Sequence, residues 1–467
     1  MTATATRGFH APARAAAAVT PQPLSGGRTL LLVLLALLYP WHIALWATSY
    51  TGKDPVIPHG GLNVSLGDSV IAIIAIVLVL QAAVGRVRLP RYALHAGLWL
   101  LAAAISTTAN AISPAVYFAI RDSVTGLVKI SAAIFWMIAV FWLLQDSFPR
   151  RFFQLAGLSV LAATGFAFQS VFENIFLGRE RAFGPFQNAN IYGNYVVLNL
   201  FLAIGIDRFL GAGAPGTNLR PATRAVLRPL VRYVSITLLL LGLLATGSRG
   251  AIVGLLAGLI PALPWRQVKR MSRRGLVAAV LGIAVFVPAL DWYFSQNPFV
   301  VTRMTQTAEG RGPNVAERLE LWQGAVQAFS ENPVVGIGYT QFPNYAEHEP
   351  NLRATLTHQT YLAAAAELGI VGLCALMWLL LSVIVDSWRA QDRNGPYVGV
   401  AHACCGFVVA ACTQGLFNNV QQERSLWIVF GIVAALIFYL RHPRVPSVTP
   451  LAHSSAGRGR LRLTTPV

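Results

Sequence analysis

A histidine stands at the entrance of a long apolar stretch, "LTHQTYLAAAAELGIVG" at residues 356–372. An imidazole group titrates near neutral pH, so it can accept a proton from a hydroxyl group as a general base. His358 could also cap the start of a helix or bind a metal ion. The nearby "EHE" at 347–349 favours a solvated acidic turn over a metal site. We take His358 as a candidate catalytic base and expect no metal ion or other cofactor.

Arg181 lies in a segment rich in aromatic and amide side chains, "GRERAFGPFQNANIYGNY". A guanidinium group stays charged and can hold a phosphate through two parallel hydrogen bonds. With Asn190 close by at the start of a predicted helix, the segment suits a phosphate or sugar ligand. The other interpretation is an interfacial belt of aromatic residues around an arginine that binds lipid headgroups.

Arg249 lies at the tip of a short hairpin, "ATGSRG", between two apolar stretches that cover residues 230–264. Two crossings in this length leave about 17 residues, or roughly 26 Å of helix, for each pass. The tip is therefore expected to lie below the membrane surface. A charge at that depth is costly and marks a functional position, unless the side chain extends to the headgroups.

Arg318 opens the helical pattern of "NVAERLELWQGAVQAFSEN". Apolar residues recur there at the spacing of an amphipathic helix, and we expect them to form its buried face: Leu319, Trp322, Val326 and Phe329. Arg318 is a third arginine that is a candidate functional residue, although it could simply pair with the glutamates Glu317 and Glu320 beside it.

Three residues after His358 complete the set of candidates. Gln359 carries an amide directly after the histidine, and Tyr361 shares the face of the histidine in a helix. Glu367 lies nine residues after His358, which is two and a half helical turns, so it points to the opposite face of a continuous helix. We therefore expect a buried structural hydrogen bond at Glu367.

The elements that must position these side chains are membrane helices. The chain has 467 residues, of which 55% are hydrophobic and only 12% charged, and its mean hydropathy is +0.56. About 25% of the residues are charged in a soluble domain. A stretch of about 20 apolar residues crosses a bilayer as a helix. The predicted fold is an all-α polytopic membrane protein with about 12 transmembrane helices.

The predicted spans are the following residues: 29–48, 66–84, 92–112, 124–144, 152–172, 190–210, 230–246, 250–264, 276–294, 360–387, 398–417 and 425–440. They divide the chain into a disordered cytoplasmic N-terminal tail (1–27), a transmembrane region (28–294), a large, partly helical periplasmic loop (295–359), three C-terminal transmembrane helices (360–440) and a cytoplasmic C-terminal tail (441–467).

The positive charge is concentrated in the tails and in alternate loops. The net charge is +18, and the side that is rich in Lys and Arg is cytoplasmic by the positive-inside rule. The charge is thus a topology signal and a contact with anionic lipids, not a nucleic-acid site. The four cysteines lie within predicted spans and are expected to be small buried hydrophobic side chains. The first span has no cleavage site and is expected to be an uncleaved anchor.

Four stretches together resemble the O-antigen ligase and polymerase superfamily of bacterial membrane glycosyltransferases. "TGSRGAIVGLLAGL" is similar to an arginine-bearing hairpin of that family, and "ERLELWQGAVQAFSENPVVGIGYTQF" to its outer loop. "THQTYLAAAAELGIVG" resembles its signature helix, and "RAFGPFQNANIYG" a fourth, looser motif. The resemblance covers roughly residues 175–390. Gln359 replaces the asparagine that often follows the signature histidine.

The resemblance implies a GT-C-like, metal-independent, inverting enzyme of lipopolysaccharide biosynthesis. It would lie in the bacterial inner membrane with its active site facing the periplasm and both termini in the cytoplasm. A ligase moves a polysaccharide from undecaprenyl diphosphate to the lipid A core. Arg181, Arg249 and Arg318 would bind the pyrophosphate, with Asn190, Gln359 and Tyr361 as further substrate contacts, and His358 would deprotonate the acceptor hydroxyl. Its partners would be the two lipid-linked glycans and membrane lipids, with no nucleic acid.

Three other functions fit parts of the pattern. An O-antigen polymerase would use the same donor with another lipid-linked glycan as the acceptor. A protein O-oligosaccharyltransferase is a further relative, but such proteins tend to carry an additional C-terminal region. A transporter would place charges near the membrane midplane and contain discontinuous helices, whereas the charges here gather at one side. The ligase is the preferred interpretation.

Overall fold

The computed structural model describes residues 25–45, 62–85, 87–186, 188–263, 313–350, 352–391 and 395–442. Within these ranges the regular structure is helical, apart from one pair of four-residue strands. The predicted all-α class is therefore confirmed for the described part of the chain, with this small strand pair as an addition that the sequence did not suggest.

The helices are α1 (Ser25–Leu38), α2 (Leu66–Ala83), α3 (Ala93–Ile112), α4 (Ile120–Leu144), α5 (Phe148–Phe176), α6 (Ala189–Gly211), α7 (Pro221–Pro229), α8 (Ile236–Thr246), α9 (Arg249–Ala262), α13 (Pro313–Glu331), α14 (Phe342–His348), α15 (Thr360–Gln391), α16 (Val398–Gln414) and α17 (Arg424–Arg441). The remaining elements are the strands β1 (His42–Leu45) and β2 (Leu62–Ser65), a 3-10 turn η1 (Gly184–Phe186) and a π-helical turn η2 (Leu230–Ser235) that joins α7 to α8.

Seven helical stretches in the described residues are long and apolar enough to cross a membrane: α2, α4, α5, α6, the continuous stretch from α7 to α8, α15 and α17. Shorter apolar helices lie in α1, α9 and α16, and α3 occupies the predicted span 92–112. The chain is thus a multi-pass membrane protein. The predicted span 276–294 lies outside the described residues, and the total of twelve stays a prediction.

The first predicted span, 29–48, is wrong in its extent. Helix α1 ends at Leu38, and Pro40 follows two residues later. Proline has no backbone N–H to donate and disfavours helical geometry in the residue before it, so the apolar run cannot continue as helix. The chain turns into strand β1, which pairs antiparallel with β2, with His42 opposite Ser65.

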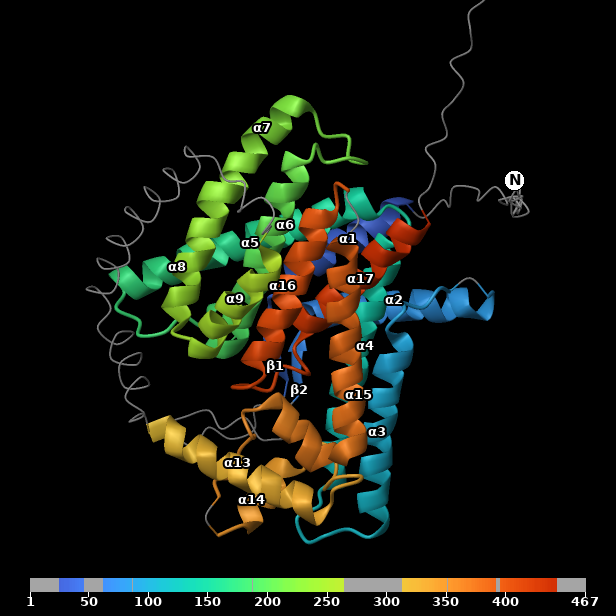
Figure 1. Cartoon of the computed structure of the whole chain (residues 1–467), viewed down its shortest axis with the longest axis vertical. Helices are drawn as coiled ribbons and strands as arrows, with labels where there is room; N and C mark the ends of the chain where they lie inside the picture. Colours follow the sequence, from blue (N-terminus) through green and yellow to red (C-terminus); the bar gives the residue numbers. More distant parts are fainter. Residues whose placement is uncertain are drawn as a thin grey trace, which may run out of the picture.

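Two layers follow one another along the long axis of the molecule (Figure 1). The larger layer is the helical bundle, with α7 at one end. The smaller layer, formed by α13 and α14, lies across the opposite end of the bundle, beside the lower ends of α3 and α15. We call this second layer the outer layer. It has a small hydrophobic core of its own, which includes Leu321, Phe342 and Tyr345.

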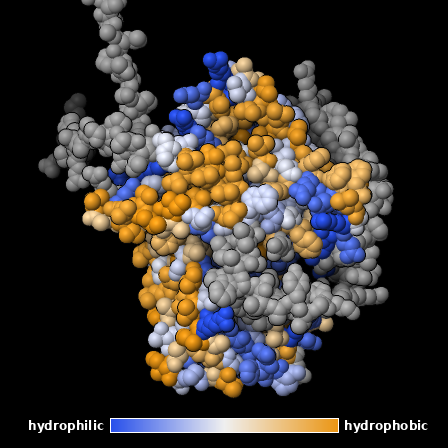
Figure 2. Space-filling view, turned by 180° about the vertical axis from the view of Figure 1, so that it is seen from behind, coloured by the Kyte–Doolittle hydropathy of each residue, from blue (hydrophilic) through white to orange (hydrophobic). Residues whose placement is uncertain are grey.

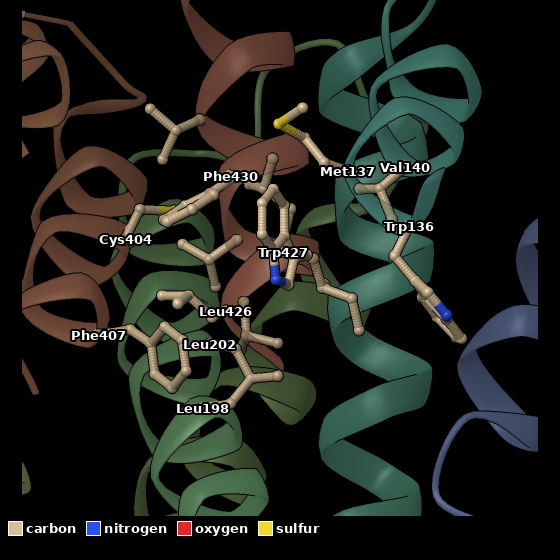
Figure 3. Close-up of a cluster of buried hydrophobic side chains, with 14 of the residues drawn as sticks. Trp136, Met137, Val140, Leu198, Leu202, Cys404, Phe407, Leu426, Trp427 and Phe430 are labelled. Carbon is tan, nitrogen blue, oxygen red and sulfur yellow. The ribbon is translucent and has the colours of Figure 1, made fainter. Parts of the chain in front are cut away.

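The centre of the bundle is a continuous hydrophobic core built by α4, α6, α16 and α17. Figure 3 shows Trp427 and Phe430 of α17 between α4 and the helices α6 and α16, with Leu198 and Leu202 of α6 below Trp427, while Trp136 of α4 points away from Trp427. Among the cysteines, Cys404 and Cys405 are buried and Cys412 is half-buried, as expected, but Cys374 is exposed. Cys374 thus lies on a helix of the bundle, but its side chain does not face the core.

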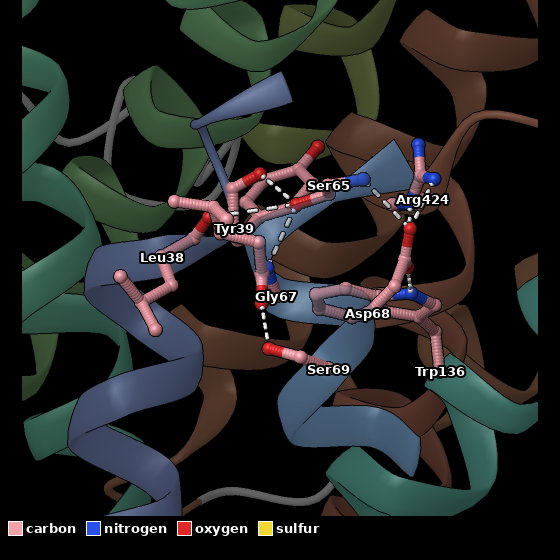
Figure 4. Close-up of polar contacts among 9 residues, drawn as sticks. Leu38, Tyr39, Ser65, Gly67, Asp68, Ser69, Trp136 and Arg424 are labelled. Atoms are coloured by element: carbon pink, nitrogen blue, oxygen red, sulfur yellow. Dashed lines mark hydrogen bonds and ion pairs between the residues drawn. The ribbon is translucent and has the colours of Figure 1, made fainter. Parts of the chain in front are cut away.

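A polar cluster ties the N-termini of α2 and α17 to α4 (Figure 4). Ser65 and Asp68 form a capping box at the start of α2. The Asp68 carboxylate also accepts hydrogen bonds from Nε of Arg424 at 2.9 Å and from Nε1 of Trp136 at 2.7 Å. Because each charge in this cluster has partners from another helix, the start of α17 is fixed relative to α2 and α4.

Helices α9 and α16 approach each other closely through glycines that recur every fourth residue. A Cβ atom on Gly258 would lie 2.2 Å from the carbonyl oxygen of Gly406, and one on Gly254 would lie 2.7 Å from that of Ala410. Small residues at this spacing allow membrane helices to pack backbone against backbone. The two helices therefore form one tightly joined unit.

Helix α15 is broken at Gly369, whose φ of 64° and ψ of −165° are not helical. The connection that follows α13 inserts at the break. Ile370 donates its N–H to the carbonyl of Pro333 at 2.8 Å, and Ile337 donates to that of Ala366 at 2.9 Å. Only glycine fits here, because a Cβ atom on Gly369 would lie 2.2 Å from the Val334 carbonyl oxygen. The first part of α15 thus carries the outer layer.

The predicted helix in the outer loop is present as α13, but its buried face differs from the expected one. Leu319 is 50% exposed and Val326 54% exposed, whereas Leu321, Ala325 and Ala328 are buried. The small residues of α13 face its neighbours because they permit a close approach, which hydropathy alone does not reveal. Apolar side chains are therefore left on the outside of the outer layer.

The surface of the bundle is broadly apolar. Figure 2 shows hydrophobic residues over much of the body of the molecule, with patches of hydrophilic residues at its upper end, at the right of the view and towards its lower end. Large exposed apolar side chains occur on α2 and α3, among them Ile76, Leu80, Leu94 and Leu101. Exposed apolar surface of this extent is what contact with lipid requires.

Candidate active site

His358 lies in the connection just before α15. Its backbone has a φ of 51°, in the left-handed region that residues with a side chain seldom adopt. The imidazole is half-buried. Backbone strain of this kind persists only where the surroundings hold it, and it concentrates at functional sites. The geometry therefore supports the choice of His358 as a functional residue.

The start of α13 lies close enough to His358 to affect its titration. Burial lowers the pKa of His358 below its ordinary value of 6.5, and the positive charge of Arg318 lowers it further. Glu317 opposes the shift, and it is itself paired with Arg353 at 3.1 Å. The fold thus brings Arg318 within electrostatic reach of His358, and it favours the neutral imidazole, which is the form that can accept a proton.

A second group of candidates gathers at the N-terminus of α9. Arg249 is the first residue of this helix. The hydroxyl of Ser248 donates to Oδ1 of Asn190 at 3.0 Å, and Nε of Arg181 donates to the carbonyl oxygen of Thr246 at 2.9 Å. The two sequence motifs that carry Arg181 and Arg249 are therefore adjacent in space.

The start of α9 has the features of an anion site. Ser248 precedes the helix, but its side chain accepts no capping hydrogen bond from it within the described residues. The first N–H groups of a helix and the positive end of its dipole attract negative charge. Arg249 adds a full positive charge at the same place, so the hairpin suits a phosphate group.

The connection between α16 and α17, residues 415–423, links the two groups. Thr360 donates its N–H to the carbonyl of Gly415 at 2.8 Å and its hydroxyl to that of Asn418 at 2.8 Å. On the other side, Nδ2 of Asn418 lies 3.0 Å from where a Cβ atom of Gly250 would be. This connection therefore contacts Thr360, two residues after His358, and Gly250, the residue after Arg249.

Two weaker candidates have structural contacts in the described part of the chain. Oε1 of Gln359 accepts the N–H of Leu362, so this side chain caps the first turn of α15. The hydroxyl of Tyr361 donates to the carbonyl of Cys412 at 2.7 Å. A substrate contact by either residue stays a prediction.

Glu367 makes the buried hydrogen bond that was expected. Its side chain is 5% exposed, and Oε1 accepts the N–H of Phe342 at 3.4 Å. Its backbone carbonyl accepts from Gly338 at 3.1 Å and from the hydroxyl of Ser106 at 2.7 Å. Glu367 therefore joins α15 to α3 and to the outer layer.

Sequence reasoning missed Thr357 and the residues 415–423. Thr357 is 1% exposed and contacts Asn419, which is 62 positions away. The polar run "FNNVQQE" at 417–423, between two apolar stretches, was the available signal. Among the described residues, no group of three or more His, Cys, Asp or Glu side chains could hold a metal ion.

Comparison with known proteins tests the resemblance. Residues 234–377 match the family model described as O-antigen ligase. The resemblance to O-antigen ligases is confirmed. The matched region contains Arg249, Arg318 and His358, while Arg181 and Asn190 precede it. The outer layer lies within it as well.

A curated relative supports the same assignment. An "O-antigen ligase" from Pseudomonas aeruginosa is 27% identical to this chain over 265 residues. The aligned part is 56% of this chain and 56% of the relative, so the match spans little more than half of each protein. The chain is thus similar to O-antigen ligases over part of its length, whereas the substrates of this chain need separate arguments.

Proposed function

We propose that this protein is an O-antigen ligase that transfers a polysaccharide from undecaprenyl diphosphate to a sugar of the lipid A core. The observation that carries the proposal is His358, a half-buried histidine with a lowered pKa beside Arg318. Residues 415–423 contact both the start of α15 and the arginine-bearing start of α9, and these contacts support a base and an anion site at the same end of the bundle.

In the proposed reaction, His358 accepts the proton of the acceptor hydroxyl group as its oxygen attacks the anomeric carbon of the donor. A new glycosidic bond forms, and the bond from the anomeric carbon to the pyrophosphate oxygen breaks. The electron pair leaves with the lipid pyrophosphate. Direct displacement inverts the anomeric configuration.

The arginines would stabilise the leaving group. Arg249 and Arg181, with the N-terminus of α9, are proposed to hold the lipid pyrophosphate, and Arg318 to approach it from the outer layer. Fixed positive groups that face a developing negative charge lower the barrier most when water is excluded. The donor carries its own leaving group, so the scheme requires no metal ion and no nucleotide.

The proposed placement in the cell follows from the two lipid-linked substrates. The protein would lie in the bacterial inner membrane with about twelve spans and a GT-C-like arrangement. The outer layer and His358 would face the periplasm, and both termini the cytoplasm. The concentration of Lys and Arg in the tails and alternate loops supports this orientation.

The test is reconstitution of the purified protein in vesicles with lipid-linked polysaccharide and core lipid. A ligase shifts the core lipid to high mass on a gel, and His358→Ala is expected to abolish the shift. His348→Ala serves as the matched control, because His348 is an exposed histidine at the end of α14 in the same outer layer. Growth of the lipid-linked glycan with unmodified core lipid would instead indicate a polymerase, and normal ligation by His358→Ala would remove the base assignment.

A further inference from the structure

The backbone of His358 has a left-handed conformation that its own side chain does not stabilise. Its φ of 51° makes it one of three non-glycine residues with positive φ among the described residues, together with Ala214 and Thr340. The left-handed region brings the Cβ atom close to the backbone, so neighbouring groups must hold the chain there. In this conformation the imidazole projects in a direction that a helical residue 358 would not give it.

The side chain of Thr357 closes a tight turn around His358. Oγ1 of Thr357 accepts the N–H of Gln359 at 3.3 Å, on the far side of the histidine. The same hydroxyl has two acceptors for its single proton, the Gln359 carbonyl at 3.0 Å and Oδ1 of Asn419 at 3.2 Å. A threonine hydroxyl that bonds the backbone two residues ahead stabilises a turn. Because Thr357 is 1% exposed, water does not compete for these bonds.

The backbone of Thr357 is held from the outer layer. Nε1 of Trp322, on α13, donates to the carbonyl oxygen of Thr357 at 3.2 Å. This bond fixes the peptide plane that leads into His358, and the bond from Thr360 to Gly415 fixes the chain after it. The histidine thus lies between two anchors, one in the outer layer and one in the bundle.

We propose that Thr357 and Trp322 are positioning residues for His358. The Thr357 hydroxyl holds the left-handed turn, and the Trp322 indole sets the orientation of that turn relative to α13 and Arg318. The inference rests on the proposed role of His358 as the base. It adds that the base is oriented by a hydroxyl group at the preceding residue and by a helix of the outer layer.

Conservative variants separate positioning from bulk packing. Thr357→Val keeps the shape and loses the hydroxyl, whereas Thr357→Ser keeps the hydroxyl. We expect Thr357→Val to lower kcat on the order of 10- to 100-fold with little change in KM, since misplacing a catalytic group by about 1 Å has effects of this size. Thr357→Ser is expected to restore most of the rate. The matched control is Thr355→Val, because Thr355 is in the same segment and its side chain makes no hydrogen bond to the described part of the chain.

The indole N–H is tested in the same way. Trp322→Phe retains a ring and removes the donor, and it is expected to lower kcat about 10-fold. Trp388→Phe, at a 49% exposed position on α15, is the control. Equal kcat values for the Thr357→Val, Trp322→Phe and unmodified proteins, together with intact folding, would overturn the proposal.

A second measurement does not depend on the reaction. If Thr357 holds a strained histidine, Thr357→Val should lower the Tm less in the His358→Gly background than in the native background, because glycine adopts positive φ without help. Equal decreases in Tm would show that the turn is not what Thr357 holds. If the decreases in Tm differ but kcat is unchanged in both Thr357→Val and His358→Ala, then Thr357 does hold the turn. In that case His358 is not the base.

Discussion

Nε of Arg181 lies 2.9 Å from the carbonyl oxygen of Thr246, three residues before Arg249. An arginine from the connection between α5 and α6 is therefore tied to the hairpin between α8 and α9. Since the hairpin is also bound to Asn190 through Ser248, three sequence segments converge at the start of α9.

Replacing either arginine by lysine tests whether the planar, two-pronged group matters. We expect Arg249→Lys and Arg181→Lys to lower kcat/KM on the order of 10- to 100-fold, because lysine keeps the charge but cannot hold a phosphate through two parallel bonds. The measurement is the initial rate of core-lipid modification. Arg150→Lys, at an exposed position in the first turn of α5, is the control. Full activity of Arg249→Lys would show that charge alone suffices there.

The pH dependence of the rate reports the environment of His358. Its pKa is lowered from 6.5, so the neutral base persists below the pH at which a free histidine becomes charged. We expect the acid limb of kcat/KM to lie below pH 6.5. Arg318→Gln removes a positive neighbour and should move the limb upwards, and Glu317→Gln should move it further down. A limb above pH 6.5 in the native protein would contradict the assignment.

The same shift affects stability with a defined sign. Because the folded pKa of His358 is below 6.5, the unfolded chain binds the proton more readily than the folded one. The contribution of this residue to the free energy of unfolding is thus greatest above pH 6.5 and decreases as the pH falls below it. The difference in Tm between native protein and His358→Gln should change over this window.

The close contact between α9 and α16 predicts that one added methyl group at Gly258 lowers the stability of the protein. Gly258→Ala would force a Cβ atom to within 2.2 Å of the Gly406 carbonyl oxygen, so the helices must separate. We expect a loss of about 1–3 kcal/mol in the free energy of unfolding, as for other overpacked interiors. Gly97→Ala is the control, since nothing lies within 4 Å of a Cβ atom there. Thermal unfolding in detergent measures both variants, and equal Tm values would disprove the close contact.

Glu367 offers a test of the outer layer. Glu367→Gln retains an oxygen that can accept the N–H of Phe342 and is expected to change stability little. Glu367→Leu leaves that buried N–H without its partner and should cost about 1–3 kcal/mol. Proteolysis of residues 332–350 monitors the docking of this segment, and the leucine variant should be cleaved faster. Identical cleavage of the two variants would mean that the carboxylate does not hold the layer.

The helices could be predicted because crossing a bilayer imposes a long apolar run. The run at 29–48 misled because hydropathy does not register that Pro40 ends the helix. The expected face of α13 was wrong for a related reason: Leu319 and Val326 are the more apolar residues, but Ala325 and Ala328 are the ones that pack.

The residue types in the sequence were enough to find the charged and titratable groups of the candidate site. They were not enough to find the residues that hold these groups in position. His358, Arg249 and Arg318 stand out as charged or titratable groups beside apolar stretches. Thr357 does not, because a threonine before a helix is ordinary. Its importance depends on Asn419 and Trp322, which reach it from distant segments, and no periodic pattern in the sequence records such contacts.

The glycine-lined contact between α9 and α16 also bears on how the candidate site is supported. Arg249 begins α9, and the connection after α16 carries the anchors of Thr360, so the start of α9 and the start of α15 are both joined to this closely packed pair of helices. Arg318 belongs to α13, which contacts the residue before His358 through the indole N–H of Trp322 and packs against the first part of α15. Arg318 and Arg249 therefore belong to two different parts of the fold, the outer layer and the bundle. The two arginine-bearing sides of the candidate site are thus supported by separate layers of the molecule.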